Sequence, residues 1–365
     1  MKHRIALFLL VTALFLVTCH KFDDPSVNYT YHIPSAGNEL EASSLTNEGM
    51  DSSLIIEMTD KIIREEFKRI DGLLILKNNK LVYEEYFHGY TESVPHNIYS
   101  ATKSITSILT GIALDKGLIE SVDAIILPLL PEYTTYANPD PRKSEITIRH
   151  LLNMSSGLDC DDWYADTETN MNQSSDWVKF TLDLPQVYDP GTHGLYCTGG
   201  AVTLGQIIEN QSEMRLDKFA DENLFGPLGI TNYEWKISGD GRISGGGGEL
   251  YLRPRDMARI GLTMLNNGVW NGNQVIPSNW VLQSMQNVIT LPGPYTGYGF
   301  LWWKQTFTKN DSQINTFFAS GNGGQEIFVI PSEQMVLVFT QGNQDTSIGI
   351  QDMDMISDYI LPAIQ

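Results

Sequence analysis

Strand patterns stand near both ends of this chain, and a long region of helical patterns separates them. Residues 72–87 form two apolar runs around a polar turn, and so do residues 326–340, so each segment predicts a β-hairpin. Between residues 100 and 285, apolar residues recur mainly at helical spacing. This segregation predicts an α+β fold and not the alternation of a doubly wound sheet. Helices are predicted at 55–70, 104–116, 148–153, 202–209, 216–223, 254–266, 278–284 and near 352–361.

Composition narrows the classes of function. With 42% hydrophobic and 19% charged residues, the 365-residue chain can bury a large core. The chain has a formal net charge of -20, and nucleic-acid binding requires a basic surface. We therefore expect no nucleic-acid partner. The seven histidines never fall into an H-E-x-x-H or Cys/His ligand spacing. We therefore expect no metal and no cofactor.

The first eighteen residues differ from the rest of the chain. Lys2 and Arg4 stand before the apolar run 5–17, which is shorter than the ~20 residues that span a bilayer. Residues 1–18 are therefore predicted to be a signal peptide. The segment Leu16-Val17-Thr18-Cys19 resembles a bacterial lipobox, which implies lipidation of Cys19 and a membrane anchor. We expect an exported protein of the periplasm, or a lipoprotein of the outer membrane or cell surface.

Export leaves Cys160 and Cys197 as an even pair in a compartment that permits disulfides. Closing that loop would stabilise the fold by roughly 3–4 kcal/mol on a chain-entropy model. Two small buried thiols explain the same residues equally well. Both interpretations stay open at this point.

The segment that carries chemistry begins at Ser100. The apolar stripe that follows it predicts a helix, so Ser100 stands at a helix N-terminus and Lys103 lies on the same face one turn later. The exposed N–H groups there favour developing negative charge, and a lysine held out of water can accept a serine proton. By itself, S-x-x-K is better explained by a serine helix cap beside a solvated lysine.

Further motifs follow in a fixed order. After Ser100-Ala-Thr-Lys103 come the segments 146–158 (ITIRHLLNMSSGL), Pro190-Gly191 ahead of Tyr196-Cys-Thr198, and 321–325 (GNGGQ). Together they resemble the serine β-lactamase and penicillin-binding protein superfamily. The segments 226–229, 253–258 and 298–303 further resemble its class C β-lactamase-like branch, which includes esterases. The resemblance implies an antiparallel sheet flanked by helices beside a helical domain, with the site in the cleft between them.

The same resemblance implies roles for individual residues. Ser100 would attack a carbonyl, Lys103 would take its proton, and Tyr196 would pass protons to the leaving group. The backbone N–H groups of Ser100 and Asn322 would form the oxyanion hole. Three further residues are implied in substrate binding: Ser320, Gly321 and Thr198.

Two positions depart from the motifs of that superfamily. Thr198 stands where the second motif, Tyr-x-Asn, has its amide, and Ala319 stands where the third motif has a lysine or histidine. In the superfamily that cation meets a substrate carboxylate, a charge-assisted contact worth roughly 1.5–3 kcal/mol. Its loss favours an ester, amide or peptide-like substrate without that carboxylate. His150, in the segment 146–158, is interpreted as a structural histidine.

We therefore expect residues 53–365 to form a serine hydrolase domain, with a helical subdomain at roughly 115–250, behind a flexible tether at 19–52. The first hypothesis is a small-molecule esterase or amidase that forms an acyl-Ser100 intermediate. A β-lactamase or DD-peptidase is the second, and a surface binding protein that does not turn over is the third. The G-x-S-x-G pattern of the α/β-hydrolases is absent from the sequence.

Overall fold

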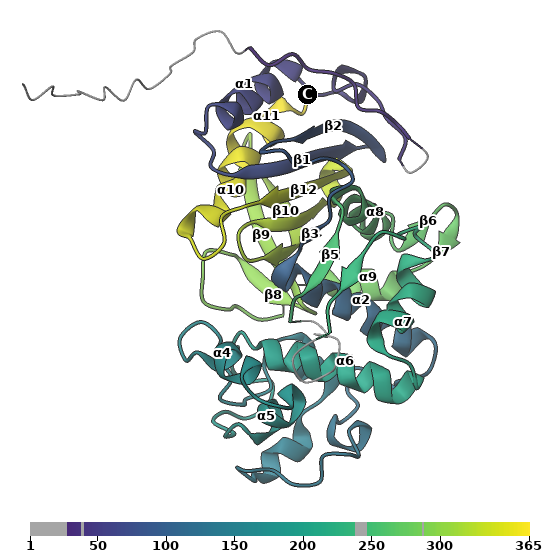
Figure 1. Ribbon diagram of the computed structural model, residues 1–365, viewed down its shortest axis with the longest axis vertical. Helices are drawn as coiled ribbons and strands as arrows, with labels where there is room; N and C mark the ends of the chain where they lie inside the picture. The colour runs from purple at the N-terminus through teal and green to yellow at the C-terminus, as the bar shows by residue number, and fades with distance from the viewer. Residues whose placement is uncertain (1–27, 38–39, 238–246, 287) are drawn as a thin grey trace, which may run out of the picture.

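The computed structural model describes residues 28–365 except 38–39, 238–246 and 287. The predicted signal peptide at 1–18 and the predicted lipidation site at Cys19 lie outside the described residues. Within the described part of the chain, no helix is both long enough and apolar enough to cross a membrane. Figure 1 shows one part built around a sheet and a second part of helices and loops below it.

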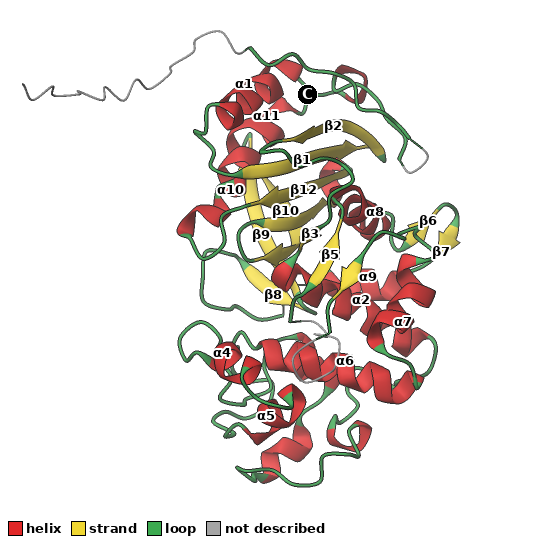
Figure 2. Cartoon of the chain, viewed as in Figure 1, coloured by secondary structure: helices red, strands yellow, loops and turns green. Residues whose placement is uncertain are grey.

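The main sheet has seven antiparallel strands in the order β2-β1-β12-β11-β10-β9-β8 (Figure 2). The two hairpins predicted from the ends of the sequence meet inside it, because β1 pairs with β12 and places Leu74 opposite Val338. Both predicted hairpins and the α+β class are confirmed. The strands are β1 (Ile70–Lys77), β2 (Lys80–Tyr86), β8 (Gly297–Gly299), β9 (Trp302–Lys309), β10 (Ser312–Gly321), β11 (Gln325–Ile330) and β12 (Met335–Gln341).

Strands β8 to β10 are absent from the sequence prediction. Phe300 and Leu301 adopt positive φ angles of 52° and 62°, so the chain turns just before β9 and breaks the strand alternation there. Strand β9 also mixes lysines, threonines and a glutamine with its aromatic residues. Because of these features, the sequence pattern does not predict the hairpin of β9 and β10, whose second strand leads to Gly321.

Helices cover both faces of the sheet. Helix α8 (Pro254–Leu265) packs on β1, β11 and β12 on one face, and the helices from the two ends of the chain pack together over the other (Figure 1). Because both faces are covered, every residue of β1, β11 and β12 is buried. The terminal helices are α1 (Ser52–Ile63), α10 (Asp352–Met355), the π-helical turn η8 (Ile356–Ile360) and α11 (Leu361–Ala363).

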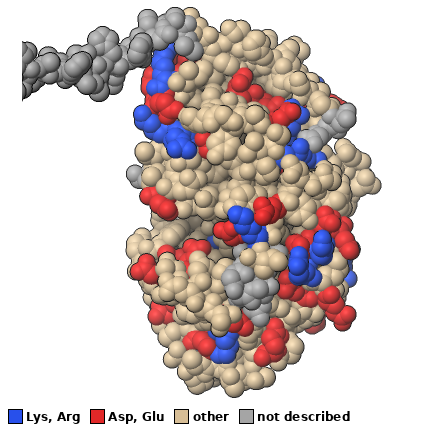
Figure 3. All heavy atoms as spheres, in the orientation of Figure 1, with Lys and Arg blue, Asp and Glu red and all other residues tan. Residues whose placement is uncertain are grey.

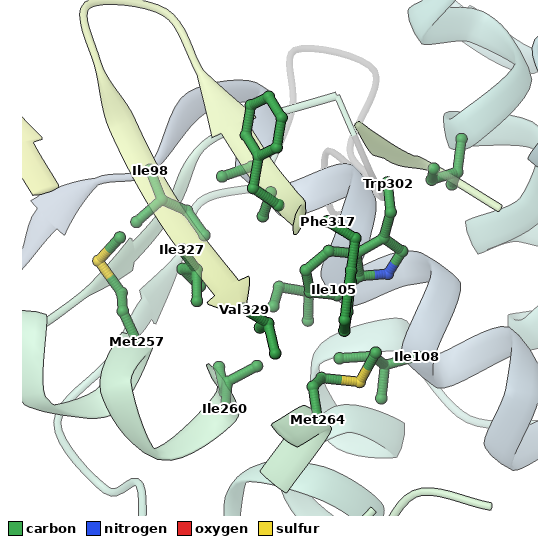
Figure 4. Close-up of a cluster of buried hydrophobic side chains, with 14 of the residues drawn as sticks. Ile98, Ile105, Ile108, Met257, Ile260, Met264, Trp302, Phe317, Ile327 and Val329 are labelled. Atoms are coloured by element: carbon green, nitrogen blue, oxygen red, sulfur yellow. The ribbon is translucent and has the colours of Figure 1, made fainter. Parts of the chain in front are cut away.

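Helix α2 (Thr102–Asp115) connects the two parts of the molecule. It contacts β10 on one side and α6 (Thr198–Ser212) on the other, and all its residues from Thr102 to Ala113 are buried. Figure 4 shows Ile105 and Ile108 among side chains of α8 and the sheet, including Trp302 and Phe317. Buried this way, α2 is a rigid base for the residues at its N-terminus.

The other elements complete the helical part and two small sheets. Helix α6 contacts α3, α4, α5 and α7, and strand β5 lies between β3 and β4. The helices are α3 (Ile148–Leu152), α4 (Thr167–Asn172), α5 (Trp177–Asp183), α7 (Leu216–Ala220) and α9 (Ser278–Ser284); the strands are β3 (His96–Asn97), β4 (Glu234–Trp235), β5 (Leu250–Leu252), β6 (Val269–Trp270) and β7 (Asn273–Gln274).

The segment predicted as a tether packs against the domain over much of its described length. Leu45 and Met50 are buried, Ala42 bridges to Leu81, and the Tyr31 hydroxyl donates to the Val82 carbonyl at 2.8 Å. The prediction of a flexible tether as far as residue 52 is therefore wrong over this stretch. A few apolar residues at irregular spacing are enough to bury it against the edge of the sheet.

Candidate active site

Ser100 lies in a strained turn that leads directly into α2. The turn spans Tyr99–Ala101, and Tyr99 has a φ of 45°, which is unfavourable for a residue with a bulky side chain. Asn97 holds the turn, because its side-chain oxygen accepts the Tyr99 N–H at 2.9 Å. The Ile98 N–H donates to the Leu250 carbonyl of β5 at 2.9 Å. Contacts from two elements thus fix the backbone that presents Ser100.

Lys103 lies one helical turn beyond Ser100 on the same face, as the spacing predicts. Its Nζ is 2.9 Å from the Ser100 Oγ and 3.4 Å from the Gly247 carbonyl. The residue is only 1% exposed, so its amine is held out of bulk water. The pair therefore has the geometry for proton transfer between a hydroxyl and a buried amine.

Tyr196 contributes its ring to the same group. The Lys103 Nζ lies 5.0 Å from the centroid of that ring. The ring stacks on Trp163 at 4.9 Å and on Trp303 at 5.7 Å, and the residue is 7% exposed. Residues 100, 103 and 196 are thus brought together from two segments almost a hundred residues apart.

A disulfide anchors the segment that carries Tyr196. Cys197 is bonded to Cys160 with an S–S distance of 2.10 Å, which decides between the two interpretations that the sequence left open. The neighbouring Asp162 N–H donates to the Tyr196 carbonyl at 3.0 Å. The loop that follows Cys160 is therefore fixed beside Tyr196 by a covalent bond and a backbone hydrogen bond.

The end of β10 lies directly against the Ser100 turn. A Cβ atom at Gly321 would stand 2.1 Å from the Ile98 carbonyl oxygen and 3.2 Å from the Ala101 nitrogen, so only glycine allows this approach. The neighbouring Ser320 hydroxyl donates to Glu326 at 2.9 Å, and the Asn322 amide donates to Asp345 at 2.7 Å. The backbone at 321–322 thus lies beside the serine, where the predicted oxyanion hole requires it; the donor role of the Asn322 N–H remains a prediction.

Thr198 lies beside Asp162. Its side chain is buried, and its N–H donates to Asp162 at 2.5 Å. Burial raises the pKa of Asp162 to about 6, and Lys103 acts in the opposite direction. Sequence reasoning did not select Asp162, because it lies in a loop that contains several other carboxylates. His150, in contrast, accepts the Thr147 N–H at 3.2 Å and caps α3, in agreement with its structural interpretation.

A cavity of about 380 Å³ opens beside Ser100. Figure 3 shows the molecule hollowed between its two parts, with several Asp and Glu side chains beside the hollow. Of the residues selected from sequence, Thr198 lines a neighbouring cavity of about 310 Å³ instead, and Lys103 lies behind the serine. Those that line the first cavity are Ser100, Tyr196, Ser320, Gly321 and Asn322. Among the described residues, no group of three or more His, Cys, Asp and Glu side chains is arranged to hold a metal ion.

Ser100 is hydrogen-bonded to a buried lysine and lines a cavity between an antiparallel α/β part and a helical part. This arrangement is typical of serine hydrolases of the β-lactamase and transpeptidase type. The chain belongs to the Beta-lactamase family, whose model matches residues 60–351. The superfamily predicted from the sequence motifs is thereby confirmed, and so is the assignment of the chain to the serine hydrolases.

Individual proteins are also similar to this chain. The chain is 24% identical to an uncharacterized protein of Alkalihalophilus pseudofirmus over 73% of this chain and 82% of that protein. It is also 24% identical to the 6-aminohexanoate-dimer hydrolase of Paenarthrobacter ureafaciens, over 63% of this chain and 60% of the relative. A solved structure from Bacillus anthracis, provisionally assigned as a 6-aminohexanoate-dimer hydrolase, has a TM-score of 0.69 and 22% identity, and the match covers 83% of this chain and 80% of that one. This structure shares the fold.

Proposed function

We propose that the protein hydrolyses an ester or amide bond through an acyl-Ser100 intermediate. The single observation that carries the proposal is the 2.9 Å contact between the Ser100 Oγ and the Nζ of Lys103, a residue that is 1% exposed. A serine hydroxyl is a weak nucleophile unless a base takes its proton. An amine at this distance and in this degree of burial is placed to do so.

The proposed reaction has two stages, acylation and deacylation of Ser100. The Ser100 Oγ bonds to the substrate carbonyl carbon as its proton passes to Lys103, and the carbonyl oxygen becomes an oxyanion beside the backbone at 321–322. The bond to the leaving group then breaks, and that group takes a proton through Tyr196. A water molecule attacks the acyl-enzyme, gives its proton back through the same groups, and releases the acid and the free serine.

The substrate class is an ester or amide without the carboxylate that β-lactams and D-Ala-D-Ala peptides carry. Ala319 supplies no cation at the position where the third motif of the family has one. One relative is named as a 6-aminohexanoate-dimer hydrolase. Another, 28% identical over 39% of this chain and 38% of its own length, is named as the Monacolin J acid methylbutanoyltransferase of Aspergillus terreus. A hydrolase and an acyl-group transferase among the relatives support an acyl-enzyme intermediate.

The proposal is tested with purified protein, p-nitrophenyl acetate and a fluorophosphonate probe. We expect the probe to label Ser100, and we expect Ser100→Ala and Lys103→Met to abolish turnover while both variants unfold at the wild-type temperature. Wild-type turnover in a folded Ser100→Ala or Lys103→Met variant would overturn the role of that residue. Hydrolysis of nitrocefin as fast as of simple esters would favour a β-lactamase, and labelling without turnover of any ester or amide would favour a binding protein.

We also propose that the protein is exported and anchored through a lipid on Cys19. The disulfide between Cys160 and Cys197 supports export, because such bonds persist in oxidising compartments. Growth with radiolabelled palmitate should label the wild-type protein and leave Cys19→Ala unlabelled. Equal labelling of both proteins would exclude Cys19 as the anchor.

A further inference from the structure

The cavity beside Ser100 combines carboxylates with aromatic rings. None of the described residues that line it is a lysine or an arginine. Its carboxylates come from both parts of the molecule, and so do its rings. The carboxylates are Asp162, Glu168, Glu326 and Asp345, and the rings are Trp163, Tyr196, Tyr295 and Trp303.

Glu326 is the most informative of the carboxylates. The residue is 1% exposed, and one of its oxygens accepts the Ser320 hydroxyl at 2.9 Å. Its other oxygen, Oε2, is buried and has no hydrogen-bond partner among the described residues. Burial raises the pKa of Glu326 well above its usual range, and the nearby Asp352 raises it further. A buried acceptor without a partner costs free energy, which a ligand with a hydrogen-bond donor would recover. A positive charge on the same ligand would favour the ionised form of the carboxyl.

The rings add a second attraction for the same kind of ligand. Trp163 is 42% exposed and lies nearly parallel to Tyr196 at 4.9 Å, and Tyr295 lies 4.9 Å from Trp303. Aromatic faces attract organic cations, and the attraction grows when the site is partly closed to water. The large negative charge of the chain also raises the local concentration of cations.

We propose that the substrate is an ester or amide that carries an ammonium group, held by the rings and carboxylates of this cavity with Glu326 as the buried acceptor. This inference rests on the proposed hydrolysis at Ser100. It also agrees with the absence of a cation at position 319. A cavity lined by carboxylates repels a substrate carboxylate and attracts a positive group.

The test compares pairs of esters that have the same shape and differ in charge. One pair is S-(2-dimethylaminoethyl) thioacetate, which carries an N–H donor and a positive charge when protonated, and 3-methylbutyl thioacetate, with the charge on the leaving group. The other is the p-nitrophenyl ester of protonated 4-(dimethylamino)butanoate and that of 5-methylhexanoate, with the charge on the acyl group. We expect kcat/KM to be at least about tenfold higher for the cation in one pair, a preference that corresponds to about 1.4 kcal/mol.

Variants then assign the preference to the cavity. Glu326→Gln and Glu168→Gln should each lower the ratio of cationic to neutral kcat/KM by about threefold or more. The exposed Glu120 lies outside the cavity, so Glu120→Gln removes the same charge and should keep the wild-type ratio. Glu168→Gln provides the test if Glu326→Gln does not fold, because Glu168 is only half-buried on α4.

Two results must be kept apart. If neither ester of either pair is hydrolysed in a Ser100-dependent manner, the proposed hydrolysis itself has failed. If the neutral esters are hydrolysed through Ser100 and the cations are not preferred in either pair, only the assignment of an ammonium substrate is overturned. A preference that Glu120→Gln lowers as much as the cavity variants do would also overturn it, because the net charge of the protein would then explain the effect.

Discussion

Replacing Gly321 by alanine tests whether the backbone at the end of β10 must lie against the serine turn. The added Cβ would stand 2.1 Å from the Ile98 carbonyl oxygen, whereas ordinary contacts of a Cβ begin at 3.4 Å. The nearest atoms are backbone atoms of the turn that presents Ser100, so they cannot move aside as a flexible side chain would. The strand end and the turn must separate by about 1 Å, and a displacement of that size near reacting atoms costs about 10²-fold in rate.

We therefore expect Gly321→Ala to lower kcat for p-nitrophenyl acetate by about 10²–10³-fold, the loss seen when one oxyanion-hole donor is removed. The overpacking should also destabilise the fold by about 1–3 kcal/mol. Steady-state kinetics gives the first number, and urea unfolding gives the second. Kinetics are measured without urea and at a temperature well below the unfolding transition, so that only folded protein is compared.

Gly200→Ala is the matched control. It lies inside α6, and its added Cβ would meet Leu151 at 3.7 Å and Cys197 at 3.8 Å, which are ordinary contacts. Alanine also suits a helix interior better than glycine by about 1 kcal/mol, so this variant should keep its activity and unfold no earlier than the wild type. Wild-type kinetics in folded Gly321→Ala would refute the claim that catalysis requires this close approach.

Three further predictions follow from other contacts. Tyr196→Phe should slow ester hydrolysis by about 10²-fold or more without changing the unfolding midpoint, because it removes a proton-transfer group and keeps the stacked ring; an unchanged rate excludes that role. Cys160→Ser should lower the free energy of unfolding by about 4 kcal/mol in urea, because a loop of 37 residues is no longer closed; an unchanged midpoint under non-reducing conditions would show that the bond does not form. Burial raises the pKa of Asp352 from 3.8 to about 7, so its contribution to stability is complete below about pH 4 and is lost as pH rises through 7. Asp352→Asn should match the wild type at pH 4 and exceed it by up to about 4 kcal/mol at pH 8.5, and equal stability of the two proteins at both pH values would contradict this.

The residues that sequence reasoning placed correctly are those whose geometry is local. Ser100 lies in the turn that leads into α2 and Lys103 lies in the first turn of that helix, so a helical spacing of three residues puts them on one face. The hairpin at 72–87 is also local, since its two strands are joined by a short turn. Tyr196 was placed through an ordered set of motifs, because nothing near it in the sequence fixes its distance from Ser100.

What the sequence could not provide depends on contacts between distant segments. The carboxylates of the cavity come from the loop at 162, helix α4, strand β11 and the segment near 345, and no local pattern separates them from the other acidic residues of the chain. Glu326 is an example, because a carboxylate within an apolar strand would be expected at the surface and is instead fully enclosed. The packed segment before residue 52 was missed for the same reason.

The register of β10 and β11 places the departure at the third motif close to Glu326. Ala319 lies where the family has its cation, and the next residue, Ser320, pairs with Glu326 on the neighbouring strand. The cation is therefore missing at the position beside a buried carboxyl, one of whose oxygens has no hydrogen-bond partner among the described residues and whose ionised form a positive charge would favour. Simple loss of the β-lactam carboxylate contact would require only the change at 319. The unpaired oxygen of this carboxyl costs free energy that a hydrogen-bond donor would recover, and a substrate ammonium group supplies such a donor together with a positive charge.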